Sequence, residues 1–129
     1  MPEASCLHVF VYGTLRKGQA NDITLLSPPP GYVGTGTTPG ALYQLGWYPG
    51  LVLGGESRVV GEVYLITAQL ERRLDEIEEI WPEPTNEYFK RLIPVEVEGA
   101  LLYCIVYEIN PERIAGKPLI ASGDWLERD

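Results

Sequence analysis

The sequence predicts an α+β domain in which strands dominate and one helix packs beside them. Three observations support this class. Short apolar runs rich in β-branched and aromatic residues recur along the 129 residues and are separated by turn residues. Fourteen glycines and eleven prolines favour loops and short strands over a helical bundle. Because only one segment has helical periodicity, we expect a single domain over residues 1–129 with about six strands, a kind that often closes into a barrel.

The amino-terminal third predicts a strand, a loop and a hairpin. Residues 7–12, LHVFVY, form an apolar run that predicts a strand buried on both faces. Residues 13–30 are expected to form a loop, because their closing SPPPG forbids regular pairing, with a brief helical turn near Asn21–Leu26. Residues 31–46 predict a hairpin that turns near Thr38–Gly40.

Further strands are expected in the middle and at the carboxyl-terminal side. The aromatic-rich segment WYPGLVLGG is interpreted as broken by Pro49-Gly50, and residues 59–66 predict the strand that follows it. Tyr88–Glu98 predict another strand, and Gly99 turns it into a last strand, LLYCIVYEI. Alternation along Tyr88–Glu98 predicts three inward side chains, those of Ile93, Val95 and Val97.

One helix is predicted with a defined start and end. Thr67 precedes AQLERRLDEIEEI and is a suitable N-cap. Leu70, Leu74 and Ile77 recur at i, i+4 and i+7, so they form one apolar stripe. Trp81-Pro82 is expected to end the helix.

Four of the five residues from Asp75 to Glu79, near the end of this helix, carry a carboxylate. At about 100° per residue, Asp75, Glu76 and Glu79 fall roughly 120° to 160° from the centre of the apolar stripe and are predicted to face water. Glu78 falls roughly 60° from that centre, at the rim of the buried face. Solvated carboxylates are the common outcome of a charge run. A rim carboxylate in a partly apolar pocket is instead a candidate for proton transfer, because burial raises its pKa.

Composition excludes several function classes. The formal net charge is −8 with only ten Lys and Arg residues, which argues against binding to nucleic acid and to anionic membranes. Cys6 and Cys104 lack metal-type spacing, and His8 is the only histidine, so the chain alone cannot supply a four-ligand zinc site. His8 is expected to be a buried or edge-strand residue rather than part of a catalytic triad. No apolar stretch reaches about 18 residues, the length that spans a membrane as a helix. We therefore expect a cytoplasmic protein with reduced thiols. We also expect no metal and no cofactor.

The loop after the first strand does not match a nucleotide-binding motif. In GTLRKGQ, Gln19 stands where a P-loop needs lysine, and no Ser or Thr follows. Gly34 and Gly36 lack the third glycine and the helix of a dinucleotide fingerprint. The start of the loop offers successive backbone N–H groups that can converge on a carboxylate, those of Gly13, Thr14 and Leu15. Spacing alone favours a simple turn.

Several motifs together resemble the γ-glutamylcyclotransferase-like family. VFVYGTLRKGQAN, YPGLV, GEVY, LDEIE, Tyr88 and the closing SGDW follow the family's order through nearly the whole chain. The resemblance is closest to the small branch near γ-glutamylamine cyclotransferase. It implies a small mixed β-barrel with one main flanking helix.

The resemblance also implies roles for individual residues. Glu78 matches the family's catalytic acid, the second glutamate of Leu-Asp-Glu-x-Glu, and Tyr88 matches a tyrosine that lines the cavity. The family's substrate loop, whose amides hold a carboxylate, falls on Tyr12, Gly13, Thr14 and Leu15. Trp47 and Tyr43 are further lining candidates. Arg16 and Lys17 are expected at the solvent edge, where they attract an anionic substrate weakly. In many relatives glycine follows the glutamate, whereas this chain continues Glu79-Ile80-Trp81-Pro82, which leaves the substrate open.

The implied activity is that of a cofactor-independent amide-cleaving cyclotransferase or lyase. It closes the glutamyl part of a small γ-glutamyl substrate into 5-oxoproline and releases the attached amine. Two alternatives stay open: a non-catalytic module that binds a small carboxylate, and an enzyme of acyl or amide transfer on a related substrate. The identity of the amine is open, and we expect a monomer or a weak homodimer.

Overall fold

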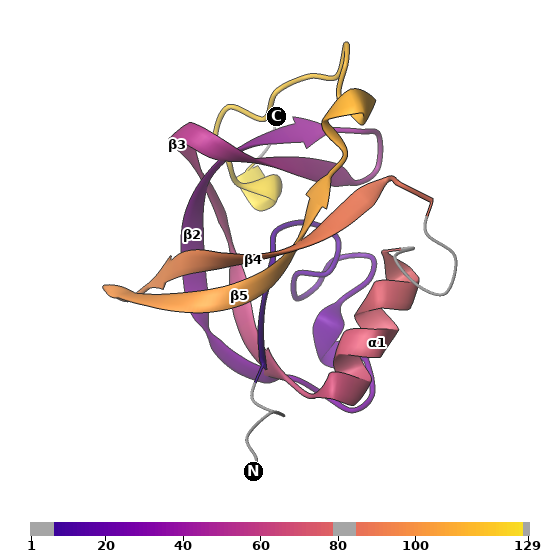
Figure 1. The fold of residues 1–129 in the computed structure, drawn as a ribbon, viewed down its shortest axis with the longest axis vertical. Helices are drawn as coiled ribbons and strands as arrows, with labels where there is room; N and C mark the ends of the chain where they lie inside the picture. Colours follow the sequence, from indigo (N-terminus) through magenta and orange to yellow (C-terminus); the bar gives the residue numbers. More distant parts are fainter. Residues whose placement is uncertain (1–6, 79–84, 128–129) are drawn as a thin grey trace.

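The computed structural model describes residues 7–78 and 85–127, and five of its strands close into a barrel in the order β1-β3-β2-β4-β5 (Figure 1). The strands are β1 Leu7–Val11, β2 Gly31–Gln44, β3 Pro49–Ile66, β4 Tyr88–Val97 and β5 Ala100–Ile109. Helix α1, Ala68–Ile77, packs outside the barrel, and short 3-10 turns cover Ile23–Leu25, Pro111–Arg113 and Trp125–Glu127. The predicted fold class, a mixed β-barrel with one main helix, is confirmed.

The sheet is mixed because β1 has neighbours of both senses. It pairs antiparallel with β3 from Leu7↔Ile66 to Val11↔Glu62. Its other side meets β5 in parallel, with Val9 opposite Ile105, and this contact closes the barrel. The first strand therefore has no open edge, and the loop that leaves it starts from a fixed point.

The predicted hairpin near Thr38–Gly40 is wrong. β2 runs straight through these residues, and the turn lies at residues 45–48, because β2 pairs with β3 all the way to Gln44↔Pro49. The register shifts between Pro39↔Arg58 and Gly40↔Leu53, so the proline lies at an irregularity that tolerates its missing N–H. Pro49-Gly50 likewise does not break a strand but begins β3.

Two apolar layers hold the fold together. Alternate side chains of the strands fill the barrel, where the indole of Trp125 from the carboxyl-terminal segment is also buried. The opposite side chains of β1, β3 and β5 pack against α1 and the Ile23–Leu25 turn. Val95 and Val97 are buried and Ile93 is partly buried against the barrel core, as the alternation predicts. The site described below lies where these two layers meet.

Helix α1 begins as predicted. The hydroxyl of Thr67 accepts a hydrogen bond from the Leu70 N–H at 3.2 Å, which caps the first turn. At the other end Glu78 is the C-cap, and its N–H donates to the Leu74 carbonyl at 2.9 Å. The predicted stop at Trp81-Pro82 lies outside the described residues. Within the described part of the chain, no helix is long and apolar enough to cross a membrane.

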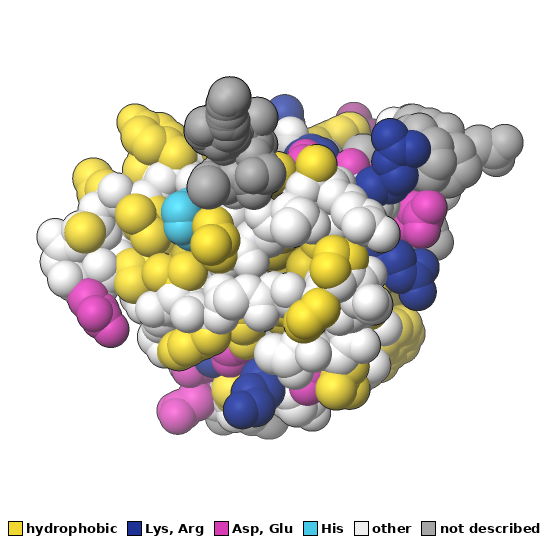
Figure 2. All heavy atoms as spheres, turned by 90° about the horizontal axis from the view of Figure 1, so that it is seen from below, with side chains coloured by type: hydrophobic (Ala, Val, Ile, Leu, Met, Phe, Trp, Pro, Cys, Tyr) yellow, Lys and Arg dark blue, Asp and Glu magenta, His cyan; other side chains and the backbone are white. Residues whose placement is uncertain are grey.

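His8 differs from its expectation. It is half-buried in β1, a strand that is paired on both sides. Figure 2 looks at the molecule from below and shows the histidine at the surface among hydrophobic side chains. It is therefore neither a core residue nor an edge-strand residue.

Candidate active site

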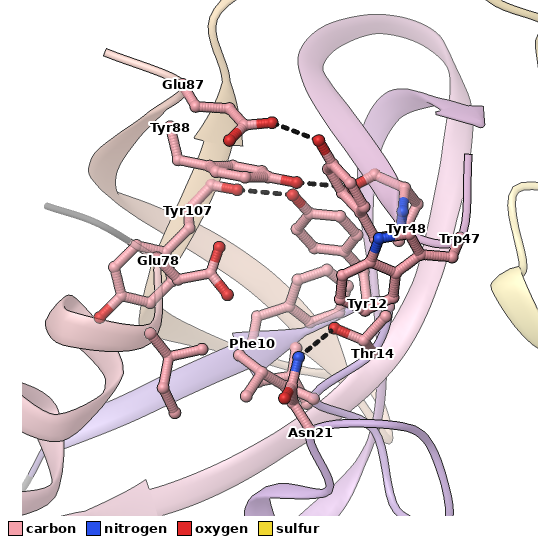
Figure 3. A pocket seen from close by; sticks show the side chains of 15 residues that line it. Phe10, Tyr12, Thr14, Asn21, Trp47, Tyr48, Glu78, Glu87, Tyr88 and Tyr107 are labelled. Atoms are coloured by element: carbon pink, nitrogen blue, oxygen red, sulfur yellow. Dashed lines mark hydrogen bonds between the residues drawn. The ribbon is translucent and has the colours of Figure 1, made fainter. Parts of the chain in front are cut away.

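A cavity of about 250 Å³, here called the main cavity, lies beyond the end of β1 (Figure 3). Its walls come from the loop after β1, the β2–β3 turn, the end of α1, the start of β4 and the outer face of β5. All six residues predicted for the site line it: Tyr12, Gly13, Thr14, Leu15, Glu78 and Tyr88. Trp47 also lines it, whereas Tyr43 is not among the described lining residues.

The loop after β1 is held by its carbonyl groups. The carbonyls of Gly13, Thr14 and Leu15 accept hydrogen bonds from the N–H groups of Arg16, Asn21 and Ile23, at 3.0, 2.8 and 2.9 Å. Among the described residues, no backbone carbonyl outside regular structure accepts from the N–H groups of the same three residues. A loop fixed by its carbonyls leaves its amides available for an anion.

Gly13 is packed too closely for a larger side chain. A Cβ at this position would lie 2.4 Å from Cγ of Pro49, which is far inside van der Waals contact. Its backbone φ is not in the left-handed region. Gly13 therefore allows the loop to pack against the start of β3, and this packing sets the distance between the loop and the far wall of the cavity.

Tyrosine hydroxyls join the walls of the main cavity. Tyr12 donates to the Tyr107 carbonyl at 2.7 Å and accepts from the Leu51 N–H at 3.3 Å. Tyr88 donates to the Pro49 carbonyl at 2.8 Å. Burial, reinforced by the charge of Glu78, raises the pKa of Tyr12, Tyr88 and Tyr107 above the ordinary tyrosine value. These side chains are therefore protonated donors at neutral pH.

Glu78 reaches the main cavity from the last turn of α1. The helix ends at this residue (φ −87°, ψ 5°), and its half-buried side chain extends toward the aromatic wall formed by Tyr12 and Tyr107 (Figure 3). This agrees with the predicted place at the rim of the buried helix face. After burial, its charge is one of the causes that raise the pKa of Tyr12, Tyr88 and Tyr107, with the hydrogen bond from Tyr107 to Asp75 the larger cause at Tyr107.

A second carboxylate of the main cavity was not predicted. Glu87 lies just before β4 and accepts a hydrogen bond from the Tyr48 hydroxyl at 2.5 Å. Asn21 was not predicted either. Its side-chain amide donates to the Thr14 hydroxyl at 3.2 Å and helps to hold the loop in place. Neither residue stands in a periodic segment; Asn21 closes the motif VFVYGTLRKGQAN, which could have indicated it, whereas Glu87 lies in no motif. The described residues that line the cavity include no lysine, arginine or histidine.

The prediction that Asp75 faces water is wrong. Its carboxylate accepts from the Tyr107 hydroxyl at 2.7 Å and pairs with Lys90 at 3.0 Å. Strands β4 and β5 extend past the apolar stripe of α1, so they cover the flank of the helix as well. Glu76 is exposed as predicted and pairs with Arg73, and Glu79 lies outside the described residues.

The expectation for Arg16 is also wrong. Only 5% of this residue is exposed, because the turn from Gly13 to Arg16 points its side chain back against β3. Its guanidinium pairs with Glu62 at 3.1 Å and with Asp124 at 2.7 Å. Lys17 is exposed as expected. Arg16 therefore lies behind the loop, away from the cavity.

Sequence comparisons identify relatives along most of the chain. The family model described as gamma-glutamyl cyclotransferase, AIG2-like, matches residues 9–127. A Vibrio cholerae protein is 41% identical over 128 residues, which cover 93% of this chain and 96% of that protein. The gamma-glutamylcyclotransferase family protein YtfP of Escherichia coli K12 is 36% identical over 124 residues, covering 95% of this chain and 99% of YtfP.

Solved structures agree with the sequence relatives. The solution structure of ytfP from Escherichia coli superposes with a TM-score of 0.64 at 34% identity, covering 95% of this chain and 99% of that one. The crystal structure of an aig2-like protein from Mus musculus gives a TM-score of 0.74 at 29% identity, covering 88% and 85% of the two chains. With this barrel and these relatives, the chain belongs to the gamma-glutamyl cyclotransferase, AIG2-like family.

Proposed function

We propose that this protein cyclises a γ-glutamyl amine or peptide to 5-oxoproline and releases the amine, with Glu78 as general acid and base. One observation carries the proposal. The Glu78 carboxylate and the amide-bearing loop Gly13–Leu15 line the same cavity of about 250 Å³ from different elements. A cavity of this size suits a substrate of a few heavy atoms beyond a glutamyl unit.

The reaction needs little from the protein beyond positioning and one proton carrier. The substrate holds its own nucleophile, the α-amine, and its own electrophile, the γ-carbonyl carbon. A bond forms between these two atoms, and the bond from the carbonyl carbon to the departing nitrogen breaks. Because both groups belong to one molecule, a folded binding pose supplies much of the rate enhancement.

Glu78 is proposed to carry the proton between the two nitrogens. The attacking α-amine must lose a proton, and the departing nitrogen must gain one, so a single carboxylate can do both in turn. Atoms and charge balance without an oxidant, a metal or water. The N–H groups of Gly13–Leu15 would hold the α-carboxylate and so place the amine near Glu78.

The aromatic wall supports this chemistry by excluding water. The hydroxyls of Tyr12 and Tyr88 are engaged with backbone carbonyls, so their rings are fixed in place. A poorly hydrated wall strengthens the interaction between the loop amides and a bound carboxylate. The side chains thus preorganise the cavity rather than take part in bond breaking.

The test is release of 5-oxoproline from γ-glutamyl amines and dipeptides by the wild type and by Glu78→Gln. The variant keeps the size of the side chain and removes its basicity, so we expect kcat to fall by about 10²- to 10⁴-fold. Glu76→Gln is the matched control, since it changes an exposed carboxylate of the same helix and should keep full activity. Full activity of Glu78→Gln would remove Glu78 as the proton carrier.

The same experiment separates the two alternative functions. If no γ-glutamyl compound yields 5-oxoproline but glutamate-like carboxylates raise the melting temperature, the protein is a binding module. If mass spectrometry finds a transferred acyl group in place of the cyclic product, the cavity serves acyl or amide transfer. Either outcome would contradict the cyclotransferase proposal.

A further inference from the structure

A second hollow of about 210 Å³, here called the side cavity, adjoins the main cavity. Its described lining residues are Leu45, Tyr48, Glu87, Arg113 and Lys117. Tyr48 and Glu87 also line the main cavity, and the hydrogen bond from the Tyr48 hydroxyl to the Glu87 carboxylate, at 2.5 Å, joins them. These two residues therefore lie at the border between the two cavities.

The side cavity has a positive excess that the main cavity lacks. Arg113 and Lys117 stand against the single carboxylate of Glu87. Neither cation forms an ion pair within 4.0 Å with a carboxylate of the described residues. Arg113 donates one N–H to the Thr85 carbonyl at 3.1 Å, and a guanidinium has four further donors. In a chain of net charge −8, two exposed cations thus line one hollow.

Most other cations of the described chain are already used within the fold. They pair with carboxylates of neighbouring elements: Arg16, Arg58, Arg73, Lys90 and Arg91. Lys17 is also exposed and forms no ion pair with a described carboxylate, so the side cavity differs in that two such cations line one hollow.

The orientation of the proposed substrate leads toward the side cavity. In Figure 3 the loop side chains Thr14 and Asn21 lie at one end of the main cavity, and Tyr48 and Glu87 lie at the opposite end. Glu78 lies between the two ends. If the loop amides hold the α-carboxylate, the amine portion beyond the γ-carbonyl extends toward Tyr48 and Glu87.

We propose that the side cavity is a subsite for the released portion of the substrate and that it binds a carboxylate carried by that portion. The inference rests on the proposed function and narrows it. The preferred substrates are γ-glutamyl amino acids or peptides, in which the amine bears a carboxylate, rather than γ-glutamyl alkylamines. Arg113 and Lys117 bind this carboxylate, and the positive excess offsets the nearby charge of Glu87.

The test compares substrates that differ only in the terminal carboxylate. γ-Glutamylglycine, γ-glutamyl-β-alanine and γ-glutamyl-4-aminobutyrate are each assayed beside the uncharged ethyl-, propyl- or butylamide of the same length. We expect at least one carboxylate-bearing member to show kcat/KM about threefold to tenfold above its uncharged partner, mainly through a lower KM. The length with the largest difference reports how far the cations lie from the reacting bond.

Variants assign the difference to the two cations. Arg113→Gln/Lys117→Gln should remove the preference by raising KM for the carboxylate substrates, with little effect on the uncharged ones. Arg58→Gln/Arg73→Gln removes the same charge away from both cavities and should keep the preference. Lys117→Gln alone guards against misfolding, since Lys117 is exposed and its side chain forms no hydrogen bond or ion pair with the described residues.

The outcomes separate the two proposals. If no substrate yields 5-oxoproline, the proposed function fails and the subsite falls with it. If both series react equally well and the double variant changes neither, only the subsite is overturned. An equal loss on both series would overturn it too, because it would show that Arg113 merely holds the Thr85 segment in place.

Discussion

Acidic residues have different partners on the two sides of the Tyr12–Arg16 segment. Behind it, Glu62 and Asp124 share the buried guanidinium of Arg16. In front of it, Glu78 and Glu87 line a cavity whose described walls include no cationic side chain. The same few residues thus separate a salt-bridged network from an acidic cavity.

The difference shows how this fold divides stability from chemistry. Glu62 also accepts hydrogen bonds from the Lys17 N–H at 3.0 Å and the Tyr64 hydroxyl at 2.9 Å, so its oxygens are occupied by structure. Glu87 instead shares a tyrosine hydroxyl, a partner that does not neutralise it. Glu62 and Asp124 help to hold the loop in place, whereas Glu78 and Glu87 line the cavity.

The largest expected effect comes from breaking the network behind the loop. Arg16→Met leaves Glu62 and Asp124 without their buried cation, so the free energy of unfolding should fall by about 3 kcal/mol. Urea denaturation measures the loss. Arg58→Met is the matched control, because the Arg58–Glu96 pair is half exposed and should contribute less than about 1 kcal/mol. Equal losses in the two variants would show that Arg16 is not a buried structural cation.

Gly13→Ala tests the front of the same segment. The new Cβ would meet Pro49 at 2.4 Å, so the loop and β3 must separate, at a cost of about 2 kcal/mol. Activity should fall as well, because Pro49 also anchors Tyr88. The control is Gly31→Ala, where the new Cβ would lie 3.8 Å from Leu65 and should be tolerated. A Gly13→Ala variant with wild-type stability and activity would contradict the packing role.

Local signals in the sequence predicted the elements that frame the site. The Thr67 cap and the Leu70–Leu74 stripe depend on neighbours within one helix turn, and the structure has both. The apolar run of β1 is likewise sufficient to predict a strand. The motifs around Tyr12 and Glu78 indicated the family, and the fold brings both residues into one cavity.

Features that depend on partners distant in sequence escaped prediction. Pro39 suggested a turn, but pairing along the full length of β3 outweighs a local turn preference. Arg16 looked like a surface cation because its partner Asp124 is 108 residues away. Asp75 contacts residues of β4 and β5. A helical projection of the α1 sequence cannot show how far these strands extend beside the helix. The side cavity similarly joins Glu87 to Lys117 across the fold.

Tyr12→Phe should have a smaller effect than either change to the loop. The hydroxyl bridges the Tyr107 carbonyl and the Leu51 N–H, so its removal leaves two buried backbone groups unsatisfied, at about 1 to 2 kcal/mol. Tyr103→Phe, at an exposed tyrosine, is the control for loss of a hydroxyl alone. Thermal unfolding of the two variants should differ by several degrees, and identical melting temperatures would remove Tyr12 as a link between the cavity walls.

The smallest effect, just above about pH 10, is the part of the alkaline loss of stability that comes from Tyr88 in the cavity wall. Burial raises the pKa of Tyr88 above the value of about 10 that it has in the unfolded chain. Below about pH 10 both states keep the proton; above it, the unfolded state releases the proton first, so folding loses stability as pH rises. The expected loss from this tyrosine is about 1.4 kcal/mol for each further pH unit until the folded pKa is reached.

Tyr88→Phe should therefore start less stable than the wild type at neutral pH, by about 1 kcal/mol for the lost bond to the Pro49 carbonyl. Because the phenylalanine has no proton to release, the two stability curves should converge above about pH 10. Guanidinium groups keep their charge in this range. The stability curve of Arg16→Met against pH should therefore run parallel to that of the wild type. Curves that stay parallel for Tyr88→Phe would mean that the cavity does not protect its tyrosines from ionisation, and the contrast between the two sides of the loop would then lie in charge alone.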